Sequence, residues 1–501
     1  MKTLGTLLTG LEVQLPKKEL LLPVPAVVCD SKQVRDGDLF VAVKGATTDG
    51  ASYIPEALKR GARIIVTEQD FPAESGTVKI LVKDSRHALA LLANRFYEAP
   101  SSALRVIGVT GTNGKTTVSY LIESVLQKAG FGVGVIGTIA YRVGERVVPA
   151  QNTTPGPLEL QSLLSQMVKE KLTYAVMEVS SHALDQKRVE TIRFDTALFT
   201  NLTQDHLDYH KTQEVYFQAK RRLFESLDEM ATAVLNGDTP YCERIIRVTR
   251  GRHLTYGLRE TADIYATSVE MSLSGSRFDV RTPAGTLKIE SKLIGIHNVY
   301  NILAAIGTGF SQEVSLPLIR EGVETLLGVP GRLERIDAGQ RFKVFVDFAH
   351  TEDALQQVLT SLRPLTPGRI LLVFGCGGDR DRLKRPHMAK VASELSDWVA
   401  VTSDNPRKED PQAILKEIEV GFPPSFRRYH LEEDRAKAIE TALLEAEEGD
   451  TVLIAGKGHE VYQIFKDRTI PFDDRQVTHE ILYHSGIAQG HGRAASSQRG
   501  F

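Results

Sequence analysis

The sequence predicts an α/β protein of several domains with parallel sheets at their centres. Short apolar runs alternate with helical patterns along most of the chain, and this alternation is typical of parallel sheets with helices on their faces. A length of 501 residues is too great for one hydrophobic core and suggests about three domains.

Changes in the pattern of apolar and polar residues along the chain predict where the domains begin and end. Residues 1–101 hold short apolar runs such as "GDLFVAV" and then a helical stretch, "RHALALLANRFYEAP", which indicates a small N-terminal α/β domain. Residues 102–330 open with the strand run "LRVIGV" and predict a central parallel-sheet domain, with an antiparallel insertion where residues 263–294 alternate. Residues 331–485 repeat the strand–helix pattern and predict a Rossmann-like, doubly wound domain. The polar, glycine-rich residues 486–501 are predicted to be disordered.

Bulk composition argues against several classes of partner. The formal net charge is −2, so no electrostatic attraction to nucleic acid or to an anionic membrane is expected. No run of 18 apolar residues is present, and the N-terminus lacks the pattern of a signal peptide. The three cysteines are far apart, without metal-type spacing, which favours a reducing compartment. We therefore expect a soluble cytoplasmic protein that acts on small molecules as a monomer.

The stretch "GVTGTNGKTT" at 108–117 predicts a phosphate-binding loop, although Val109 stands where the strict Walker pattern has its first glycine. It lies between an apolar strand run and a helical pattern, so backbone N–H groups of the glycine turn can bind phosphates at a helix N-terminus. Lys115 would reach the terminal phosphates, and the Thr116 hydroxyl would hold Mg²⁺. An ordinary glycine turn before a core helix is the weaker interpretation. The predicted ATP-binding residues here are Gly111, Thr112, Asn113, Gly114, Lys115, Thr116 and Thr117.

Two further polar residues follow strands of the same predicted sheet. Glu178 ends the run "YAVMEV", and His206 comes after the run "TALFTNLT". Alone, Glu178 could be a helix cap and His206 a turn residue. Because ligands bind outside the carboxyl ends of parallel strands, we expect both side chains to converge on the phosphate loop, with Glu178 as a metal ligand.

In this order, the motifs resemble those of the Mur ligase family, the ATP-dependent amide-forming enzymes of peptidoglycan assembly. That family spells its phosphate loop "TGTNGKT", which accounts for Val109. The resemblance covers nearly the whole chain and is carried by "DSKQVRDGDLFVAVKG", "NTTP", "MEVSSHALDQKRV", "TNLTQDHLDYH", "YFQAKRRLF", "GIHNVYN", "VPGRLERI", "VDFAHTEDAL", "TSDNPRKEDP" and "GKGHEVYQ". It implies a three-domain fold, ATP as co-substrate and Mg²⁺ as cofactor.

Within the family, the resemblance points to the reaction that adds meso-2,6-diaminopimelate to UDP-N-acetylmuramoyl-L-alanyl-D-glutamate. ATP would phosphorylate the γ-carboxylate of the D-glutamate, and an amine would attack the acyl phosphate. Anionic phosphates must then approach an anionic carboxylate, so the site has to concentrate positive charge. The resemblance implies that Lys115, Glu178, His206 and Lys220 form the catalytic set.

Lys220 has two opposed interpretations. From the residues alone, the helical pattern of "YFQAKRRLF" favours a solvated lysine on an amphipathic helix. The resemblance instead implies a carbamylated lysine, whose carboxylate-like group would bind a second Mg²⁺. The implied metal ligands are Thr116, Glu178, His206 and carbamylated Lys220.

The resemblance also assigns substrate residues outside the phosphate loop. For the UDP-linked substrate, these are Ser31, Thr153, Thr154, Ser180, Gln186 and Arg188. For ATP, they are Asn298, Arg332, Asp347 and His350. Glu352 stands where the family more usually has proline, and His297 where it more usually has phenylalanine.

The third domain is expected to select the amine through the element Asp404-Asn405-Pro406-Arg407. A guanidinium binds a carboxylate bidentately, so Arg407 suits the distal carboxylate that distinguishes diaminopimelate from lysine. A surface arginine after a turn is the alternative. The implied amino-acid-binding residues are Arg380, Asp404, Asn405, Pro406, Arg407, Gly456 and Glu460, with Glu460 pairing the distal ammonium.

Several other functions compete with this one. A lysine-adding Mur ligase would keep the chemistry, but Arg407 disfavours it. A folylpolyglutamate synthetase would not need the N-terminal domain. A P-loop ATPase without ligase activity would need neither "MEVSSH" nor the Arg407 element. A non-catalytic nucleotide-binding module is disfavoured because the sequence retains Lys115, Thr116, Glu178 and His206.

Overall fold

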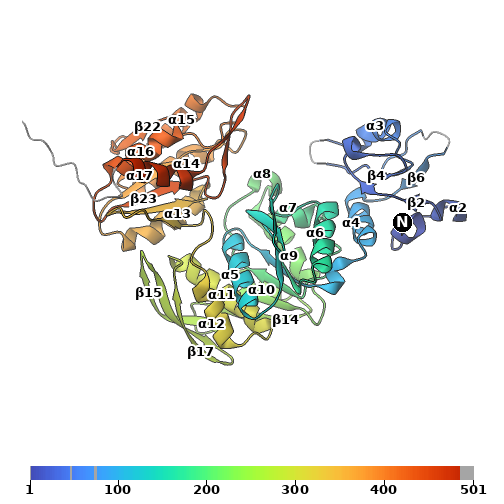
Figure 1. Ribbon diagram of the computed structural model, residues 1–501, viewed down its shortest axis with the longest axis horizontal. Helices are drawn as coiled ribbons and strands as arrows, with labels where there is room; N and C mark the ends of the chain where they lie inside the picture. Colours follow the sequence, from blue (N-terminus) through green and yellow to red (C-terminus); the bar gives the residue numbers. More distant parts are fainter. Residues whose placement is uncertain (1, 46–47, 73–75, 486–501) are drawn as a thin grey trace, which may run out of the picture. The chain divides into compact units, whose positions relative to one another are not determined.

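The computed structural model describes residues 2–45, 48–72 and 76–485 (Figure 1). The predicted disordered segment 486–501 lies outside this range. Contacts divide the described residues into two compact units, the first drawn from 1–202, 209–264 and 304–322, and the second from 203–208, 265–303 and 323–485. Among the described residues, no helix combines the length and the apolar character that a membrane crossing requires.

The N-terminal part of the first unit is built on a parallel sheet with the order β3-β4-β5-β6. The apolar runs that predict strands here do form them, and the predicted helix is α4. Leu39, Val41, Ile64 and Val66 of the sheet and Leu92 of the helix are completely buried in one core. The elements are β1 (Lys2–Thr3), α1 (Leu4–Leu7), α2 (Lys17–Leu20), β2 (Pro23–Val24), β3 (Val27–Val28), β4 (Leu39–Val41), α3 (Ile54–Lys59), β5 (Ile64–Thr67), β6 (Val78–Leu81) and α4 (Ser85–Phe96).

The central sheet of the first unit runs in the order β10-β9-β8-β11-β7-β12-β13-β14. Strand β7, which leads into the phosphate loop, is parallel to β11 on one side and to β12 on the other, and Glu178 pairs with Val109. The carboxyl ends of the three strands therefore share one edge. The strands are β7 (Arg105–Thr110), β8 (Val133–Ile136), β9 (Ala140–Val143), β10 (Arg146–Pro149), β11 (Tyr174–Glu178), β12 (Thr196–Phe199), β13 (Thr232–Asn236) and β14 (Arg252–Gly257).

Helices pack on this sheet through apolar side chains that recur at helical spacing. In the helix after the phosphate loop, Val118, Leu121, Ile122 and Val125 are buried, as their spacing predicts. The helices of this part are α5 (Lys115–Lys128), α6 (Pro157–Lys169), α7 (Ser181–Asp185), α8 (Leu207–His210), α9 (Gln213–Glu225), α10 (Cys242–Ile246), α11 (Ile296–Ser311) and α12 (Leu316–Thr325), of which α8, α11 and α12 include residues of the second unit.

The second unit contains the predicted antiparallel insertion and a doubly wound sheet. Strands β15 (Ile264–Ser272), β16 (Gly275–Thr282) and β17 (Gly285–Ser291) are antiparallel, as their alternation predicts. The other sheet has the order β18-β19-β23-β20-β21-β22 and is parallel except for β18, an antiparallel edge strand that the strand–helix pattern does not predict.

Buried apolar cores cover both faces of the doubly wound sheet. The loops that follow the carboxyl ends of its parallel strands therefore meet at one edge of the sheet, outside these cores. Its elements are β18 (Glu334–Ile336), β19 (Lys343–Asp347), α13 (Glu352–Leu362), β20 (Ile370–Phe374), α14 (Lys384–Leu395), β21 (Trp398–Val401), α15 (Pro411–Glu419), β22 (Tyr429–Leu431), α16 (Arg435–Glu445), β23 (Thr451–Ala455), β24 (Tyr462–Ile464), β25 (Thr469–Pro471) and α17 (Asp474–His484).

Candidate active site

The glycine turn of the phosphate loop is held against the segment that follows β12. Gly111 has a φ of 146°, and a Cβ there would lie 1.8 Å from the Thr200 hydroxyl, so only glycine fits. The N–H of Thr112 donates to the Asn201 carbonyl over 2.9 Å, and the N–H of Asn113 to the Asn201 side-chain oxygen over 3.0 Å. The sequence motif contains Asn201 but gives no hint of this bracing role.

Lys115 lies across the loop at the start of α5. Its Nζ donates to the carbonyl oxygens of Gly111, over 3.0 Å, and Thr112, over 2.8 Å. Gly114, with a φ of 86°, is the N-cap of the helix, and Thr116 and Thr117 are buried in the first turn. The helix N-terminus and the ammonium therefore bring positive potential to the same turn, as an anion site requires.

Glu178 is 1% exposed and accepts hydrogen bonds from two hydroxyls. Its Oε2 accepts from Thr116 over 3.1 Å and from Thr138 over 2.9 Å, while Oε1 accepts from the Thr138 N–H over 2.9 Å. A Cβ at Gly137 would lie 2.5 Å from Oε1, so this glycine makes room for the carboxylate. The predicted convergence of Thr116 and Glu178 is present. Thr138 was not predicted, although it follows the end of β8 at the same sheet edge.

These two oxygen donors fit a magnesium ion that takes its remaining ligands from water and phosphate. Mg²⁺ is commonly bound by one or two protein oxygens together with substrate phosphates. Within 2–45, 48–72 and 76–485, no group of three or more histidine, cysteine, aspartate and glutamate side chains could hold a metal by itself. The fit therefore depends on the Thr116–Glu178 pair and on the phosphates of the nucleotide.

Lys220 is buried, which overturns the interpretation as a solvated lysine. Its side chain is 1% exposed in α9, and Nζ donates to the Gly111 carbonyl over 2.7 Å. The ammonium also lies 4.5 Å from the ring centre of Tyr216, whose hydroxyl is 3.2 Å from that of Thr112. The helix therefore directs Lys220 and Tyr216 at the phosphate loop, a direction that the amphipathic pattern does not reveal.

His206 lies in the segment 203–208, which groups with the second unit. Its backbone is left-handed, with a φ of 54°, and its side chain is 45% exposed and 3.5 Å from the Asp205 carboxylate. Its convergence with Glu178 stays a prediction.

Five of the six residues assigned to the UDP-linked substrate form one cluster beside Glu178. The Thr154 hydroxyl donates to the Glu178 carbonyl over 2.8 Å and accepts from the Ser180 N–H over 3.0 Å. Arg188 donates to the Thr154 carbonyl over 2.8 Å and to the Gln186 side-chain oxygen over 2.7 Å. The Thr153 hydroxyl lies 3.1 Å from that of Thr138. The sixth, Ser31, belongs to the N-terminal sheet, where it is buried and donates to Glu56 over 2.8 Å.

Two of the four second-unit residues that the resemblance assigns to ATP line a cavity, and the other two lie at the end of β19 and just after it. The cavity has a volume of about 430 Å³ and is lined by Asn298 and Arg332 among others. The Arg332 guanidinium lies 4.8 Å from the Phe348 ring centre. Asp347 ends β19 and accepts from the N–H groups of Leu333 and Ala349 over 2.7 and 2.8 Å, and burial raises its pKa.

His350 follows two residues later. Its Nδ1 is 2.9 Å from the Phe348 carbonyl, and its own carbonyl accepts from Lys384 over 2.7 Å. Burial, with the nearby charge of Lys384, lowers the pKa of His350, which favours a neutral ring. The sequence motifs gave no role to Phe348 or Lys384.

The residues assigned to the amino acid lie in two loops of the second unit. Asp404, Asn405 and Pro406 are buried after β21, and Asn405 donates to the Glu460 carboxylate over 2.8 Å. Arg407 has a left-handed backbone, with a φ of 55°, and donates to the Gly378 carbonyl over 2.8 Å.

On the second loop, Gly456 has a φ of 114° and lies against the Asp404 carboxylate, from which a Cβ would be 3.0 Å. Glu460 also pairs with Lys457 over 3.1 Å, a buried cation that the sequence analysis did not single out. Arg380 is exposed, with its Nη1 3.4 Å from the Asp379 carbonyl.

Comparison with known proteins accounts for this combination of fold and site. The chain matches the model of the Mur ligase family catalytic domain over residues 23–97, the Mur ligase middle domain over 109–309, and the Mur ligase glutamate ligase domain over 331–458. These matches and the phosphate loop define an ATP-dependent ligase that forms amide bonds. The chain belongs to the Mur ligase family.

Two proteins with similar sequences carry the same name. The UDP-N-acetylmuramoyl-L-alanyl-D-glutamate–2,6-diaminopimelate ligase of Solibacter usitatus is 46% identical over 490 residues, which are 97% of this chain and 99% of that protein. The enzyme of the same name from Geobacillus thermodenitrificans is 47% identical over 460 residues, 91% of this chain and 94% of its own.

Two solved structures have a similar fold. One of a ligase of that name is 35% identical, covers 92% of this chain and 95% of its own, and has a TM-score of 0.67. The MurF ligase of Thermotoga maritima in complex with ADP shares the fold, with a TM-score of 0.61, 22% identity, and coverage of 92% of this chain and 97% of its own.

Proposed function

We propose that this ligase joins 2,6-diaminopimelate to the γ-carboxylate of the D-glutamate in UDP-N-acetylmuramoyl-L-alanyl-D-glutamate, with conversion of ATP to ADP and phosphate. The observation that carries the proposal is near full-length identity of 46% to a ligase with this reaction in its name. The Arg407 element and the partly buried Glu460–Asn405 contact in the C-terminal domain support the choice of amino acid. The matched family segments support domain boundaries at residues 101 and 330.

The first chemical step needs positive charge at the phosphate loop. A carboxylate oxygen of the substrate attacks the γ-phosphorus of ATP, and the bond to the bridging oxygen of ADP breaks. The N–H groups of Gly111 to Gly114 and the ammonium of Lys115 would bind the phosphates. Thr112 and Asn113 would exchange their Asn201 partners, and Lys115 its carbonyl partners, for phosphate oxygens. Thr116 and Glu178 would hold Mg²⁺, which supplies Lewis-acid charge stabilisation when bound.

The substrate cluster beside Glu178 would hold the acceptor at this site. Thr154 and Arg188 are tied to Glu178 and its neighbours, so a UDP-linked substrate bound by them would present its carboxylate near the metal ligands. The guanidinium of Arg188 and the hydroxyls of Thr153 and Ser180 suit pyrophosphate and carboxylate groups.

The second step forms the amide. The neutral amine of diaminopimelate attacks the acyl carbon, phosphate leaves, and the nitrogen loses a proton. Arg407 would bind the distal carboxylate and Glu460 the distal ammonium, which together orient the reacting amine. A lysine would leave the guanidinium of Arg407 without its carboxylate, and a site built around such a group discriminates strongly.

We also propose that Lys220 is carbamylated. Its ammonium would first lose a proton, and the neutral Nζ would then add to the carbon of CO₂ with loss of a second proton. The resulting carbamate would place negative charge beside the loop that carries Lys115. That group and His206 would complete a second magnesium site. We also expect a monomer in the cytoplasm.

The test is ADP formation from ATP, UDP-N-acetylmuramoyl-L-alanyl-D-glutamate and magnesium, with diaminopimelate, with lysine, or with no amino acid. We expect rapid ADP formation only with diaminopimelate, together with the amide-linked product by mass spectrometry. ADP formation that ignores both the nucleotide sugar and the amino acid would instead identify an ATPase.

A further inference from the structure

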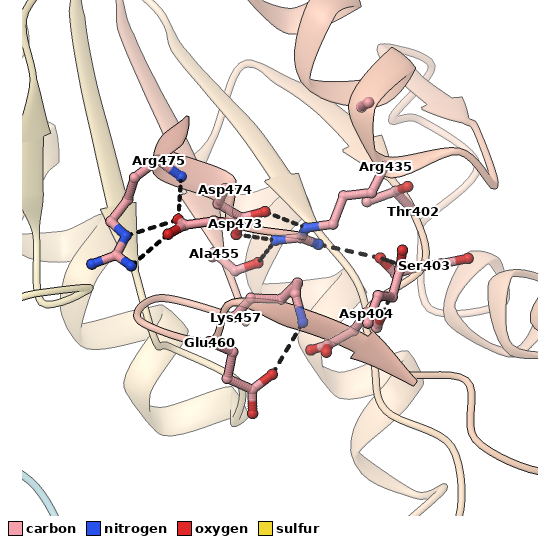
Figure 2. A network of polar contacts seen from close by, with 12 residues as sticks. Thr402, Ser403, Asp404, Arg435, Ala455, Lys457, Glu460, Asp473, Asp474 and Arg475 are labelled. Atoms are coloured by element: carbon pink, nitrogen blue, oxygen red, sulfur yellow. Dashed lines mark hydrogen bonds and ion pairs between the residues drawn. The ribbon is translucent and has the colours of Figure 1, made fainter. Parts of the chain in front are cut away.

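A completely buried ion pair lies behind the two loops that carry the amino-acid residues. Arg435 and Asp474 are each 0% exposed at the side chain, and they are the first residues of α16 and α17. The guanidinium donates from Nε and Nη2 to the two carboxylate oxygens of Asp474, each over 2.7 Å. Figure 2 shows this bidentate pair at the centre of a polar network.

The same guanidinium also contacts two backbone carbonyls. Its Nη2 donates to Ala455 over 3.0 Å, and its Nη1 to Ser403 over 3.4 Å (Figure 2). Ala455 is the last residue of β23, directly before Gly456, and Ser403 comes directly before Asp404. Each carbonyl therefore lies at the base of one of the loops 404–407 and 456–460.

No ladder of sheet hydrogen bonds joins the bases of these loops. They follow β21 and β23, and the sheet order places β20 between these two strands. A side chain that reaches both carbonyls spans this gap. The forked guanidinium can do so while it pairs with a carboxylate, whereas an ammonium acts as a single point charge.

Stability alone is a weak explanation for such a pair. Removing two charges from water is costly, and well-packed apolar residues in place of a buried ion pair are often neutral or stabilising. What apolar residues cannot replace is the pair of hydrogen bonds to the loop bases.

A second buried cation links the same loops nearer their tips. The Nζ of Lys457 donates to Glu460 over 3.1 Å, to the Tyr462 carbonyl over 2.6 Å and to the Asn405 side-chain oxygen over 3.4 Å. Asn405 and Glu460 are joined directly as well, over 2.8 Å. The two loops are thus tied at the base and at the binding residues.

We propose that the Arg435–Asp474 pair is a positioning device that sets the separation of the loops 404–407 and 456–460, and through it the selection of a diamino diacid over lysine. The proposal rests on the proposed function. Arg407 on one loop and Glu460 on the other would bind the carboxylate and the ammonium of one distal amino-acid centre. These groups are covalently joined in the ligand, so a change in loop separation weakens recognition of both together.

The test compares wild-type enzyme with the double variant Arg435→Met/Asp474→Leu, which removes both charges at once. We expect a melting temperature within a few degrees of wild type and KM values for ATP and the UDP-linked substrate within about twofold. We expect the KM for diaminopimelate to rise by about tenfold or more, and the preference for diaminopimelate over lysine to fall by a similar factor.

A matched control removes an ion pair at the opposite edge of the same sheet. Arg369 precedes β20 and pairs over 2.8 Å with Asp450, which precedes β23. The double variant Arg369→Met/Asp450→Asn should leave the KM for diaminopimelate unchanged even if it lowers the melting temperature. Arg435→Lys keeps the charge but loses the fork, so it should fold and still show a raised KM for diaminopimelate.

Amide hydrogen exchange without substrate separates this proposal from the proposed function. We expect faster exchange in peptides covering 403–408 and 455–464 of the Arg435→Met/Asp474→Leu and Arg435→Lys variants. Wild-type enzyme that forms no ADP with diaminopimelate would refute the proposed function, whatever the exchange shows. Unchanged exchange, a wild-type KM for diaminopimelate in Arg435→Lys, or equal changes in all three KM values would overturn the positioning role.

Discussion

The hydroxyl of Thr116 donates to the carboxylate of Glu178 over 3.1 Å, which joins the first turn of α5 to the end of β11. The two residues are 62 positions apart in the sequence, and the parallel pairing of β7 with β11 brings them together. A magnesium ligand set needs oxygen atoms at one point, and this contact is where we propose that the metal would bind.

Glu178→Gln should lower ADP formation by about 10²- to 10³-fold, because the neutral amide removes the negative charge that would bind magnesium.

Thr116→Val should raise the magnesium concentration required for half-maximal rate. The measurement is ADP release over a magnesium titration. Ser119→Ala on the same helix removes a hydroxyl that donates to the Lys115 carbonyl, and it should leave the titration unchanged. Equal magnesium dependence in wild type and Thr116→Val would contradict the ligand assignment.

Lys220→Ala should abolish activity, and it should also remove a carbamate signal. Wild-type enzyme equilibrated with ¹³C-bicarbonate should give a carbamate carbonyl resonance in its ¹³C NMR spectrum. The reason is that labelled CO₂, in equilibrium with the bicarbonate, would supply the carbamate carbon. Lys128→Ala, a change at a partly exposed lysine paired with Glu321, should keep both the resonance and the activity. A wild-type spectrum without the resonance would show that the buried amine remains unmodified.

The strands and helices could be predicted from the sequence because periodicity reports which side chains are buried. Glu178 was predicted at a strand end, and the structure places it there beside Thr116. Lys220 shows where this reasoning fails, because a helical pattern identifies an apolar face but not which neighbour it meets. Thr138 was missed for a related reason, since its partner Glu178 comes from a distant segment. The contact of Lys457 with Asn405 is likewise between distant segments, although Glu460 is only three positions away.

Arg407→Ala should raise the KM for diaminopimelate by about 10²-fold or more and leave the KM for ATP unchanged, since Arg407 would bind only the distal carboxylate. Discrimination against lysine should shrink by a similar factor. Steady-state kinetics with both amino acids provide the measurement. Arg468→Ala is the control, because Arg468 is exposed and lies over the Phe465 ring. Normal diaminopimelate kinetics in Arg407→Ala would refute the role of this residue.

His297 should make the enzyme less stable as the pH falls below neutrality. Its Nδ1 lies 3.2 Å from the Ser361 hydroxyl, and burial lowers its pKa from 6.5 to about 4. Above pH 6.5, the ring is neutral in both folded and unfolded states, so it adds no pH dependence. Between pH 6.5 and 4, the unfolded chain binds a proton that the folded chain does not, and stability falls with pH. At pH 5 the loss amounts to about 2 kcal/mol.

His297→Phe should therefore flatten the decrease in melting temperature between pH 7 and pH 5, at a small cost at pH 7 from the lost contact with Ser361. Part of the decrease should persist, because burial also lowers the pKa of His459, to about 3. Thermal unfolding of both proteins across this pH range provides the measurement. Parallel curves would mean that His297 is protonated equally in the folded and unfolded states. A smaller slope in His297→Phe would identify this partly buried ring as one cause of the acid sensitivity.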